Sequence, residues 1–497
     1  MSTSSRHYDV VVVGSGFGGA TTAYKLAMAG ARVALIERGG WVERDAEDWD
    51  ARSILLARRY RGESPVQVSL YGGERPSEYP NETVGGASIF YGGASLRLRE
   101  SDFDRWPIDY DTLAPHYDEA ERLLGIHGSS GLDPHEPSRS AAYPFEPIPP
   151  TGPAERIQDA ARTLGYTPFP IPLAINFADD AREQCILCTT CDGYPCRIEA
   201  KNDLTTTVLK GAQKVGLEII ANCVAGRFVW TGSCIQSLSC VDRSSGSEIS
   251  FTADTFVLGA GALSSPTLLL RSGIVHPFIG RFLMRHCNVI VTCVFPYQTN
   301  PERTFHKQTC LTDFYEQQRS DTGASVGVIQ DIYTPDPVVM KAHAPVWGKW
   351  VIGLTHRYMQ NLLCVAEDDP REENTVTLAG EKDPFGLEVA RVTHDYTDAD
   401  RSRSNVLTQG AKAILQEAGG RFPHRYLIDT FSHGVGSVRM GMSADDSALD
   451  TTCKLHQMDN LYVSDGCFMP TSGGVNPSLT IAANGLRVGE HLVRARG

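Results

Sequence analysis

The N-terminal part of the chain alternates two short apolar runs with one helical stretch. Tyr8 and Val10–Val13 form the first run, as expected of a strand that is covered on both faces in a parallel sheet. A helical stretch ends at Ala29, and Arg32–Ile36 form the second run. Strand, helix and strand in this order predict a βαβ unit with parallel strands.

Two later segments have the same strand character and are expected to return to this sheet. They cover 216–230 and 246–274, and the second runs through Thr255–Leu258 into Gly259–Gly261. A helix is predicted to begin near Pro266, because proline suits the first turn, where its missing N–H has no partner in any case. These segments therefore extend the first sheet.

The middle of the chain has a different periodicity. Residues 284–396 alternate β-branched and aromatic residues with turn signals, which predicts a mostly antiparallel sheet. Amphipathic helices are predicted at the end of 82–128 and over 398–418. The polar stretch 39–80 is expected to be a loop-rich connection, and 129–153, rich in Ser, Pro and Gly, a linker. The pattern thus combines a parallel-sheet part with a second part inserted into it.

A glycine motif lies between the first strand and the first helix. Gly14, Gly16 and Gly19 have the spacing G-x-G-x-x-G, in which the glycines permit a tight turn, a close approach to a pyrophosphate and close helix packing. Glu37 follows the second strand, eighteen positions beyond Gly19, where a carboxylate can accept hydrogen bonds from ribose hydroxyls. The motif predicts dinucleotide binding. It does not separate NAD from FAD, and its acidic residue disfavours NADP.

Composition and charge narrow the classes of function. The 497 residues are 41% hydrophobic and 21% charged, with a formal net charge of −13. A negative surface repels phosphate backbones and anionic lipids, which argues against nucleic-acid and membrane-surface partners. No apolar run approaches the roughly 20 residues that cross a bilayer, and the leader MSTSSRHYDV lacks the features of a secretion signal. We therefore expect a cytoplasmic protein without a membrane span.

Further motifs follow the glycine fingerprint in a fixed order along the chain. They are VGGASIFYGG, VLGAGALSSPTLLLRSGI, and HGVGSVRMG with NLYVSDGCFMPTSGGVNPSLTIAANGLR. Together the motifs resemble the glucose–methanol–choline (GMC) family of flavoprotein oxidoreductases, and the resemblance covers essentially the whole chain. Within the family, the chain looks most like bacterial enzymes that oxidise sugar hydroxyls. These include the aminoglycoside 6′-dehydrogenases of antibiotic biosynthesis and, more distantly, the pyranose oxidases.

The order of elements and the resemblance together imply an α/β fold with two discontinuous domains. A Rossmann-like FAD-binding domain would comprise 1–115, 181–283 and 430–497. A substrate-binding α+β domain, built on a mostly antiparallel sheet, would be inserted as 116–180 and 284–429.

The resemblance implies FAD as the cofactor. Gly14, Gly16, Gly19 and Glu37 would hold its ADP half. The other cofactor positions that match the family are Val224 at the adenine, Gly85, Gly86 and Ser88 beside the flavin ring, Asp465 and Gly466 at the pyrophosphate and ribityl chain, and Tyr91, Asn476 and Pro477 close to the ring.

Two positions depart from the pattern of relatives. Pyranose oxidases tether FAD through a histidine, and Phe90 stands at that position here. A phenyl ring cannot form the bond, so we expect non-covalent FAD. Many relatives carry an asparagine near flavin N5, where this chain has Tyr91. The resemblance therefore implies nothing about how this chain adjusts the reactivity of N5 or of oxygen.

The resemblance also implies a catalytic pair. In the family a His–His or His–Asn pair acts on the substrate hydroxyl, and the matching positions here are His433 and Asn476, 43 positions apart. His433 would take the hydroxyl proton, a task that suits imidazole because its ordinary pKa is near the working pH. Asn476 would donate a hydrogen bond to the oxygen. Taken alone, His433 would be interpreted as a buried histidine bonded to a carbonyl rather than as a base.

The implied reaction is the oxidation of a CH–OH group of a small-molecule alcohol or sugar by hydride transfer to flavin N5. Oxygen or a carrier would accept the electrons. Other polar residues are expected to have structural roles: His456 precedes a strand, and His286 is expected to serve packing. Arg97 and Arg99 could meet a polar substrate, be solvated, or support the flavin loop.

Four cysteines lie close together in the segment CILCTTCDGYPC. Cys185, Cys188, Cys191 and Cys196 have the spacing C-x₂-C-x₂-C-x₄-C, one residue longer at its end than a ferredoxin run. Four thiolates could hold an iron–sulfur cluster or zinc, and the alternative is structural thiols or a disulfide. With a cluster, the protein would be a sugar dehydrogenase that passes electrons to a protein acceptor.

Two further functions stay open at this point. A few relatives in the family are lyases or light-driven decarboxylases, which keep FAD without net redox chemistry. The glycine motif by itself would also suit a NAD-dependent dehydrogenase.

Overall fold

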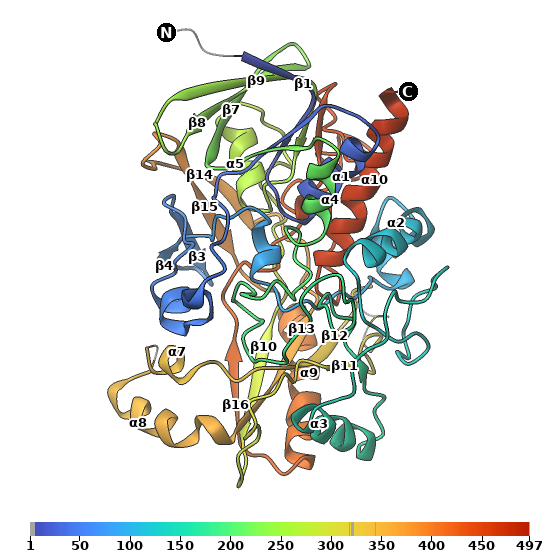
Figure 1. Ribbon diagram of the computed structural model, residues 1–497, viewed down its shortest axis with the longest axis vertical. Helices are drawn as coiled ribbons and strands as arrows, with labels where there is room; N and C mark the ends of the chain where they lie inside the picture. The colour runs from blue at the N-terminus through green and yellow to red at the C-terminus, as the bar shows by residue number, and fades with distance from the viewer. Residues whose placement is uncertain (1–4, 318, 320–322, 343, 497) are drawn as a thin grey trace.

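The computed structural model of the protein describes residues 5–317, 319, 323–342 and 344–496. It contains three sheets. In Figure 1 the seven-stranded sheet lies at the top, the six-stranded sheet at the bottom and the four-stranded sheet beside the junction between them. The predicted α/β class, with a Rossmann-like part and a second, antiparallel part, is confirmed.

The seven-stranded sheet contains the predicted βαβ unit. Its order is β6 (Glu218–Ile220), β2 (Val33–Ile36), β1 (Ser5–Val13), β9 (Glu248–Leu258), β8 (Cys234–Asp242) and β7 (Cys223–Thr231), with β17 (Leu461–Val463) paired to β9. β1 pairs in parallel with β2 and with β9. The run Val10–Val13 is buried at the centre of the sheet, which is why its residues are apolar on both faces.

Helices cover this sheet and lead away from its strand ends. They are α1 (Phe17–Met28), α2 (Tyr110–Leu123), α4 (Val208–Lys214), α5 (Ser264–Arg271) and α10 (Ser478–Arg496). α1 and α10 pack side by side (Figure 1), and the Thr22 hydroxyl donates a 2.9 Å hydrogen bond to the Gly485 carbonyl between them. The C-terminal motif thereby returns to the glycine fingerprint.

The six-stranded sheet is antiparallel throughout its pairs. Its order is β16 (Arg421–Leu427), β10 (Val289–Val294), β13 (Met359–Ala366), β12 (Gly327–Ile332), β11 (Thr309–Leu311) and β5 (Phe169–Pro170). α9 (Asp398–Glu417) and α3 (Gly152–Thr163) pack on it around a separate apolar core that includes Leu407 and Ile414.

The four-stranded sheet joins distant segments. It consists of β14 (Thr375–Lys382), β15 (Glu388–His394), β3 (Val66–Leu70) and β4 (Gly73–Glu78). The expectation of a loop-rich connection over 39–80 is wrong where β3 and β4 form. Val66, Val68 and Leu70 alternate with polar residues and are buried, the pattern of a strand with one covered face.

The segment 284–396, which was expected to be sheet, is interrupted by helices in its described part. They are α7 (Pro337–Ala342) and α8 (Val346–Thr355). The short helices of the chain are η1 (Ala46–Trp49), η2 (Arg52–Leu56), η3 (Gly86–Ile89), η4 (Glu100–Arg105), η5 (His356–Tyr358) and η6 (Gly466–Phe468). Among the described residues, none of the helices has the length and apolar character to cross a membrane.

Candidate active site

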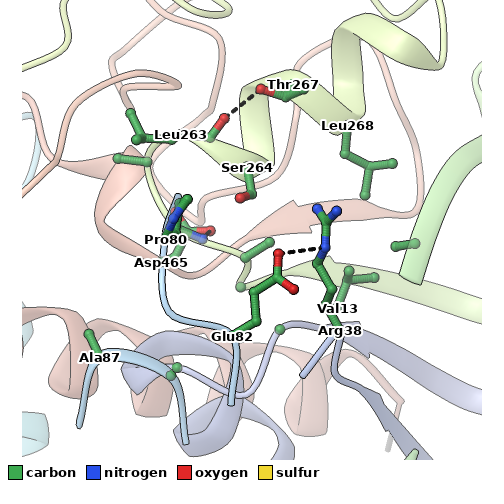
Figure 2. A pocket seen from close by; sticks show the side chains of 18 of the residues that line it. Val13, Arg38, Pro80, Glu82, Ala87, Leu263, Ser264, Thr267, Leu268 and Asp465 are labelled. Atoms are coloured by element: carbon green, nitrogen blue, oxygen red, sulfur yellow. Dashed lines mark hydrogen bonds and ion pairs between the residues drawn. The ribbon is translucent and has the colours of Figure 1, made fainter. Parts of the chain in front are cut away.

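A cavity of about 330 Å³ opens where the turn after β1 faces the start of α5. Figure 2 shows Ser264, Thr267 and Leu268 of α5 on one side of it, and Glu82 and Ala87 on the other. Its lining also includes Gly14, Gly16, Glu37, Arg271, Gly434 and Asp465. We call this space the glycine-lined cavity.

The glycine fingerprint packs backbone against backbone at the floor of this cavity. Gly14 has a φ of +97°, and a Cβ on it would lie 2.4 Å from the Gly259 carbonyl oxygen. A Cβ on Gly19 would lie 1.9 Å from the Gly14 carbonyl oxygen. Because real side chains do not approach so closely, the turn, the loop after β9 and the first turn of α1 can be this near only with glycine.

Glu37 directly follows β2 and lies beside the glycine turn after β1. Its Oε2 accepts hydrogen bonds from the Ser15 N–H (3.0 Å) and hydroxyl (2.6 Å), and its Oε1 accepts from the Gly39 N–H (2.9 Å). Burial raises the pKa of Glu37. The carboxylate therefore lines the cavity and at the same time braces the glycine turn. Nearby, Cys223 and Ala225, which flank Val224 in β7, line the same cavity.

Asp465 ties the C-terminal motif to the start of α5. Its Oδ2 accepts from the Gly261 N–H (2.8 Å) and the Ser265 hydroxyl (2.5 Å), and its Oδ1 accepts from the Cys467 N–H (2.9 Å). Gly466 lines the cavity beside it. Two loops about 204 positions apart in the chain are held together at this carboxylate.

The η3 segment supplies the wall opposite α5. Gly85 and Gly86 have left-handed backbones, with φ of +92° and +53°, and the Gly85 N–H donates to the Ser15 hydroxyl oxygen at 2.9 Å. The Ser88 hydroxyl is buried and donates to the Gly85 carbonyl at 2.7 Å. Gly86 lines the cavity, so Ser88 supports the turn while Gly86 presents backbone to the open space.

Two arginines line the cavity, together with several carboxylates that include Glu82. The Arg38 guanidinium faces Glu82 at 2.8 Å, as Figure 2 shows. Arg271, at the end of α5, has an Nε without a hydrogen-bond partner among the described residues, and burial lowers its pKa to about 10. A buried N–H without a hydrogen-bond partner is costly, and an anion such as a phosphate would relieve that cost. Glycine backbone, a helix start and an available cation together suit a phosphate-bearing ligand.

Two polar side chains meet next to this cavity. His433 Nε2 lies 3.5 Å from Asn476 Nδ2, and we call these residues the polar pair. His433 is half-buried, and the residues on either side of it, Ser432 and Gly434, line the cavity. Asn476 is buried, and its Oδ1 accepts a 2.7 Å hydrogen bond from Gln330 Nε2 on β12. Side chains that were expected to converge are thus brought together from loops 43 positions apart.

The charge state of His433 follows from its surroundings. Burial, above all, lowers the pKa of His433 well below its ordinary value of 6.5, and the neighbouring His286 and Lys307 act in the same direction. Neutral imidazole has one nitrogen with a lone pair and can accept a proton. The pair therefore combines a proton acceptor with an amide donor, which is the complement of a hydroxyl group.

His286 is in direct contact with the polar pair. Its Nδ1 lies 2.9 Å from His433 Nδ1, and its Nε2 faces the carbonyls of Ser472 (3.2 Å) and Gly473 (2.9 Å). The expectation that His286 serves packing alone does not describe these polar contacts, which join residues 147 positions apart. Asn288, whose Nδ2 is 3.5 Å from His433 Nδ1, lies two positions later. The sequence signal for this contact was that His286 and Asn288 stand two positions apart just before a strand, where such residues share a face.

Other positions expected near the flavin surround these features. Tyr91 packs edge-on against Phe17, which lines the cavity, with ring centroids 5.2 Å apart. Phe90 lies beside Tyr60 at 6.2 Å. Pro477 directly precedes α10, next to Asn476 in sequence.

Arg97 and Arg99, whose roles the sequence leaves undecided, form ion pairs within the protein. Arg97 is buried and pairs with Glu121 (2.7 Å) and Asp118 (2.6 Å), and these partners raise its pKa. Arg99 is buried and pairs with Asp133. Arg97 therefore links the segment before η4 to α2, and Arg99 links it to the loop that follows α2. His456, which precedes β17, shares a 3.1 Å hydrogen bond with Ser447.

The cysteine segment does not form a metal site in the described part of the chain. Cys185, Cys188, Cys191 and Cys196 are free thiols, and no group of three or more His, Cys, Asp or Glu among the described residues is placed to hold a metal ion. Burial raises the pKa of Cys191 well above its ordinary value, which opposes the thiolate that a metal needs. The iron–sulfur and zinc alternatives are therefore not supported.

Comparison with known families decides the affiliation of the chain. A family model described as GMC oxidoreductase matches residues 8–288, and a C-terminal model of the same description matches residues 370–485. The chain belongs to the GMC oxidoreductase family. GMC oxidoreductases bind FAD, and members of the family oxidise CH–OH groups. The expected resemblance and the expected enzyme class are confirmed.

Curated relatives span nearly the whole length of this GMC oxidoreductase. Paromamine 6'-oxidase from Streptomyces fradiae is 30% identical over 517 residues, which cover 97% of this chain and 90% of the relative. The enzyme 6'''-hydroxyparomomycin C oxidase from Streptomyces lividus is 27% identical, with 99% and 93% covered. Among solved structures, pyridoxine 4-oxidase from Mesorbium loti has a TM-score of 0.68 and 21% identity, with 97% and 99% covered. Formate oxidase from Aspergillus oryzae has a TM-score of 0.71 and 15% identity, with 100% and 99% covered. These two structures share the fold.

Proposed function

We propose that this GMC oxidoreductase binds FAD non-covalently in the glycine-lined cavity and oxidises a hydroxyl group held by the polar pair. One observation carries the proposal: an imidazole Nε2 and an amide Nδ2 stand 3.5 Å apart beside the cavity. A hydroxyl group both donates and accepts a hydrogen bond, so it matches an acceptor and a donor placed side by side.

The lining of the cavity suits the ADP half of FAD. Gly14 and Gly16 bring backbone to the open space, and the start of α5 and Arg271 provide positive potential for a pyrophosphate. Glu37 lies at the end of β2, where a carboxylate can accept ribose hydroxyls. Ser15 occupies both lone pairs of Oε2 and holds the carboxylate in place, whereas Oε1 accepts from the Gly39 N–H and keeps a second lone pair for a ribose hydroxyl.

When bound, FAD supplies the acceptor for the hydride that leaves the hydroxyl-bearing carbon. His433 accepts the hydroxyl proton at Nε2 as the O–H bond breaks and the C=O bond forms. Asn476 donates an N–H to the same oxygen, and its own orientation is held by Gln330. A positioned base of this kind contributes about 10²- to 10⁴-fold in rate.

The relatives support a substrate with several polar groups. Two of them are named as oxidases of paromamine and of a hydroxyparomomycin, and a third is named 2-methyl-1,2-propanediol dehydrogenase. We propose an alcohol, sugar or aminoglycoside as the substrate class, with oxygen or a small carrier as the electron acceptor. The wall around the pair is polar, with Gln330 and the ion pair of Lys307 and Asp192 (2.7 Å) among its neighbours.

The test is anaerobic mixing of purified holoenzyme with a panel of alcohols, sugars and aminoglycosides. We expect a yellow protein whose flavin absorbance bleaches with at least one of them. The His433→Ala variant should keep bound FAD and bleach about 10²- to 10⁴-fold more slowly, whereas His456→Ala, a histidine outside the pair, should bleach at the rate of the parent. Reduction of His433→Ala at the parent rate would remove the base assignment.

Two other outcomes would replace the proposal. Conversion of a substrate without any net bleaching would indicate non-redox chemistry on this fold. A colourless protein that reduces NAD would indicate a nicotinamide dehydrogenase.

A further inference from the structure

We propose that His286 is a positioning residue that selects the tautomer of His433 and so makes it competent as a base. The inference rests on the proposed function for its consequence, but its structural content concerns hydrogen atoms on two imidazoles and can be measured without turnover. It begins at one backbone carbonyl, that of Gly473.

The carbonyl of Gly473 determines which nitrogen of His286 carries hydrogen. Nε2 of His286 faces this oxygen at 2.9 Å and the Ser472 carbonyl at 3.2 Å. A carbonyl can only accept, so Nε2 must carry the hydrogen and donate. His286 is almost fully buried, and burial lowers its pKa, so the ring is neutral and its Nδ1 bears a lone pair.

That lone pair determines the state of His433. The two Nδ1 atoms are 2.9 Å apart, and two lone pairs at this distance would repel each other. The Nδ1 of His433 must therefore donate to the Nδ1 of His286. A neutral imidazole has only one N–H, so the Nε2 of His433 is left with the lone pair that a base needs.

The same logic continues through Asn476. A lone pair on His433 Nε2 calls for the amide Nδ2 of Asn476 at 3.5 Å rather than its oxygen. The Asn476 oxygen is then directed to Gln330, whose Nε2 donates to it at 2.7 Å. In this arrangement Gln330 donates to Asn476, Asn476 donates to His433, and His433 donates to His286, so each contact joins one donor and one acceptor.

The reversed arrangement shows what depends on His286. If His286 donated from Nδ1, the Nδ1 of His433 would accept, and its Nε2 would carry hydrogen. Nε2 could then not take a proton from a hydroxyl group, and Asn476 would have to turn its oxygen toward it. The two carbonyls behind His286 exclude this arrangement. Asn288, whose Nδ2 lies 3.5 Å from His433 Nδ1 and whose buried Oδ1 has no hydrogen-bond partner among the described residues, fits the proposed order with its amide turned so that Oδ1 faces His433. Losing the acceptor at Nδ1 would leave His433 free to populate both tautomers.

The direct test is ¹⁵N NMR of holoenzyme labelled at histidine, in the oxidised state and without substrate, at a pH where His433 is neutral. The signals of His433 are assigned by their loss in His433→Ala. We expect Nδ1 at the shift of a nitrogen bearing hydrogen and Nε2 at the shift of a nitrogen with a lone pair. The opposite assignment in the wild type would overturn the proposal, whatever the activity of any variant.

Two variants give the functional readout. His286→Leu removes the acceptor, and we expect the flavin reduction rate at saturating substrate to fall by about 10- to 100-fold with little change in KM. In His286→Gln, Oε1 can accept from His433 while Nε2 donates to Gly473, so most of the rate should return. Equal rates for Leu and Gln, or a parent rate in His286→Leu, would contradict a tautomer role.

The matched control is His127→Leu. His127 is also buried and neutral, with Nδ1 facing the Glu146 carbonyl at 2.7 Å, outside the polar pair. We expect a loss of stability without a change in the His433 signals. If His286→Leu fails to fold, the wild-type spectrum and His286→Gln still decide the proposal. A parent-like His433→Ala combined with the expected spectrum would reject the proposed function and leave the tautomer assignment intact.

Discussion

The glycine-lined cavity and the polar pair lie side by side but are built from different atoms. At the cavity, backbone meets backbone: Gly14 under Gly259, and Gly19 against Gly14. At the polar pair, side chains from separate loops and strands meet, and their order is held by a chain of hydrogen bonds to His286 and Gln330. The cavity therefore requires residues that have no side chain, whereas the polar pair requires hydrogen atoms on particular nitrogens.

This difference predicts different kinds of damage. A substitution at the cavity should act on cofactor affinity by steric means, with little dependence on chemistry. A substitution at the pair should leave the cofactor in place and act on rate, with strong dependence on donor and acceptor character. The experiments below separate the two regions in this way, from the largest expected effect to the smallest.

The largest effect is expected at Gly14. In Gly14→Ala the new Cβ would lie 2.4 Å from the Gly259 oxygen, and φ is +97°, so the turn must move away from the cavity. We expect FAD affinity to fall by at least about 100-fold, equivalent to about 3 kcal/mol, measured as flavin retained after gel filtration. Gly216→Ala is the control, because φ there is +101° with nothing within 4 Å of the Cβ. Loss of flavin in both variants would show that backbone strain, not close approach, is responsible.

The next effect is expected at Asn476 and should spare the cofactor. Asn476→Leu keeps the size of the side chain and removes the N–H that faces His433. A hydrogen bond to a developing negative oxygen is worth about 1.5–3 kcal/mol, so flavin reduction should slow by about 10- to 100-fold with normal FAD content. Stopped-flow reduction of the variant checks this. The control is Asn374→Leu, which removes a buried amide bonded to the backbone of Asp395. A slow Asn374→Leu enzyme would attribute the effect to general destabilisation.

Arg271 offers a smaller and more specific change. Its side chain is half-buried beside the cavity, and its buried Nε has no hydrogen-bond partner among the described residues. We expect Arg271→Leu to weaken FAD binding by about 10-fold while the melting temperature of the apoprotein stays constant or rises, because a buried N–H without a hydrogen-bond partner is removed. Titration with FAD and thermal unfolding of the apoprotein measure the two effects. The exposed Arg162→Leu should change neither. A parallel fall in both quantities for Arg271→Leu would indicate a purely structural role.

The smallest effect is the pH dependence of the pair. His433 acts as a base only when neutral, so its rate should rise with pH through its pKa and then reach a plateau. At the ordinary pKa of 6.5, only about a quarter of the imidazole would be neutral at pH 6. Burial lowers the pKa of His433 well below 6.5, so we expect kcat/KM to fall by less than about twofold between pH 8 and pH 6. A half-point at or above 6.5 would contradict the burial of this histidine.

The same difference explains how much of the molecule could be predicted from its sequence. A backbone-built site follows local rules, and the spacing of Gly14, Gly16 and Gly19 between an apolar run and a helix was enough to predict the turn that lines the cavity. The βαβ unit and the antiparallel middle sheet also follow from local periodicity, and the structure confirms both. The positions of His433 and Asn476 came from their motifs and a family resemblance, and their role stays a prediction.

Contacts between distant side chains could not be read in this way. His286 and Gln330 reach the polar pair because β10 and β12 lie in one sheet with defined register, separated by β13. Apart from the spacing of His286 and Asn288, nothing in the residues around them distinguishes that position from any other buried polar site. Likewise, β3 and β4 form only because β15, more than 300 positions later, supplies a partner strand for the alternating face of Val66–Leu70. Here tertiary pairing, rather than local pattern, determines the strand.

The four-stranded sheet also constrains how the molecule can open. β3 and β15 run in parallel from Val66 opposite Ala390 to Leu70 opposite His394. A motion that separated the segment of β3 from that of β15 would have to break the backbone hydrogen bonds between these two strands along their whole length. We therefore expect FAD to enter and leave the folded protein through the cavity while these two strands stay paired.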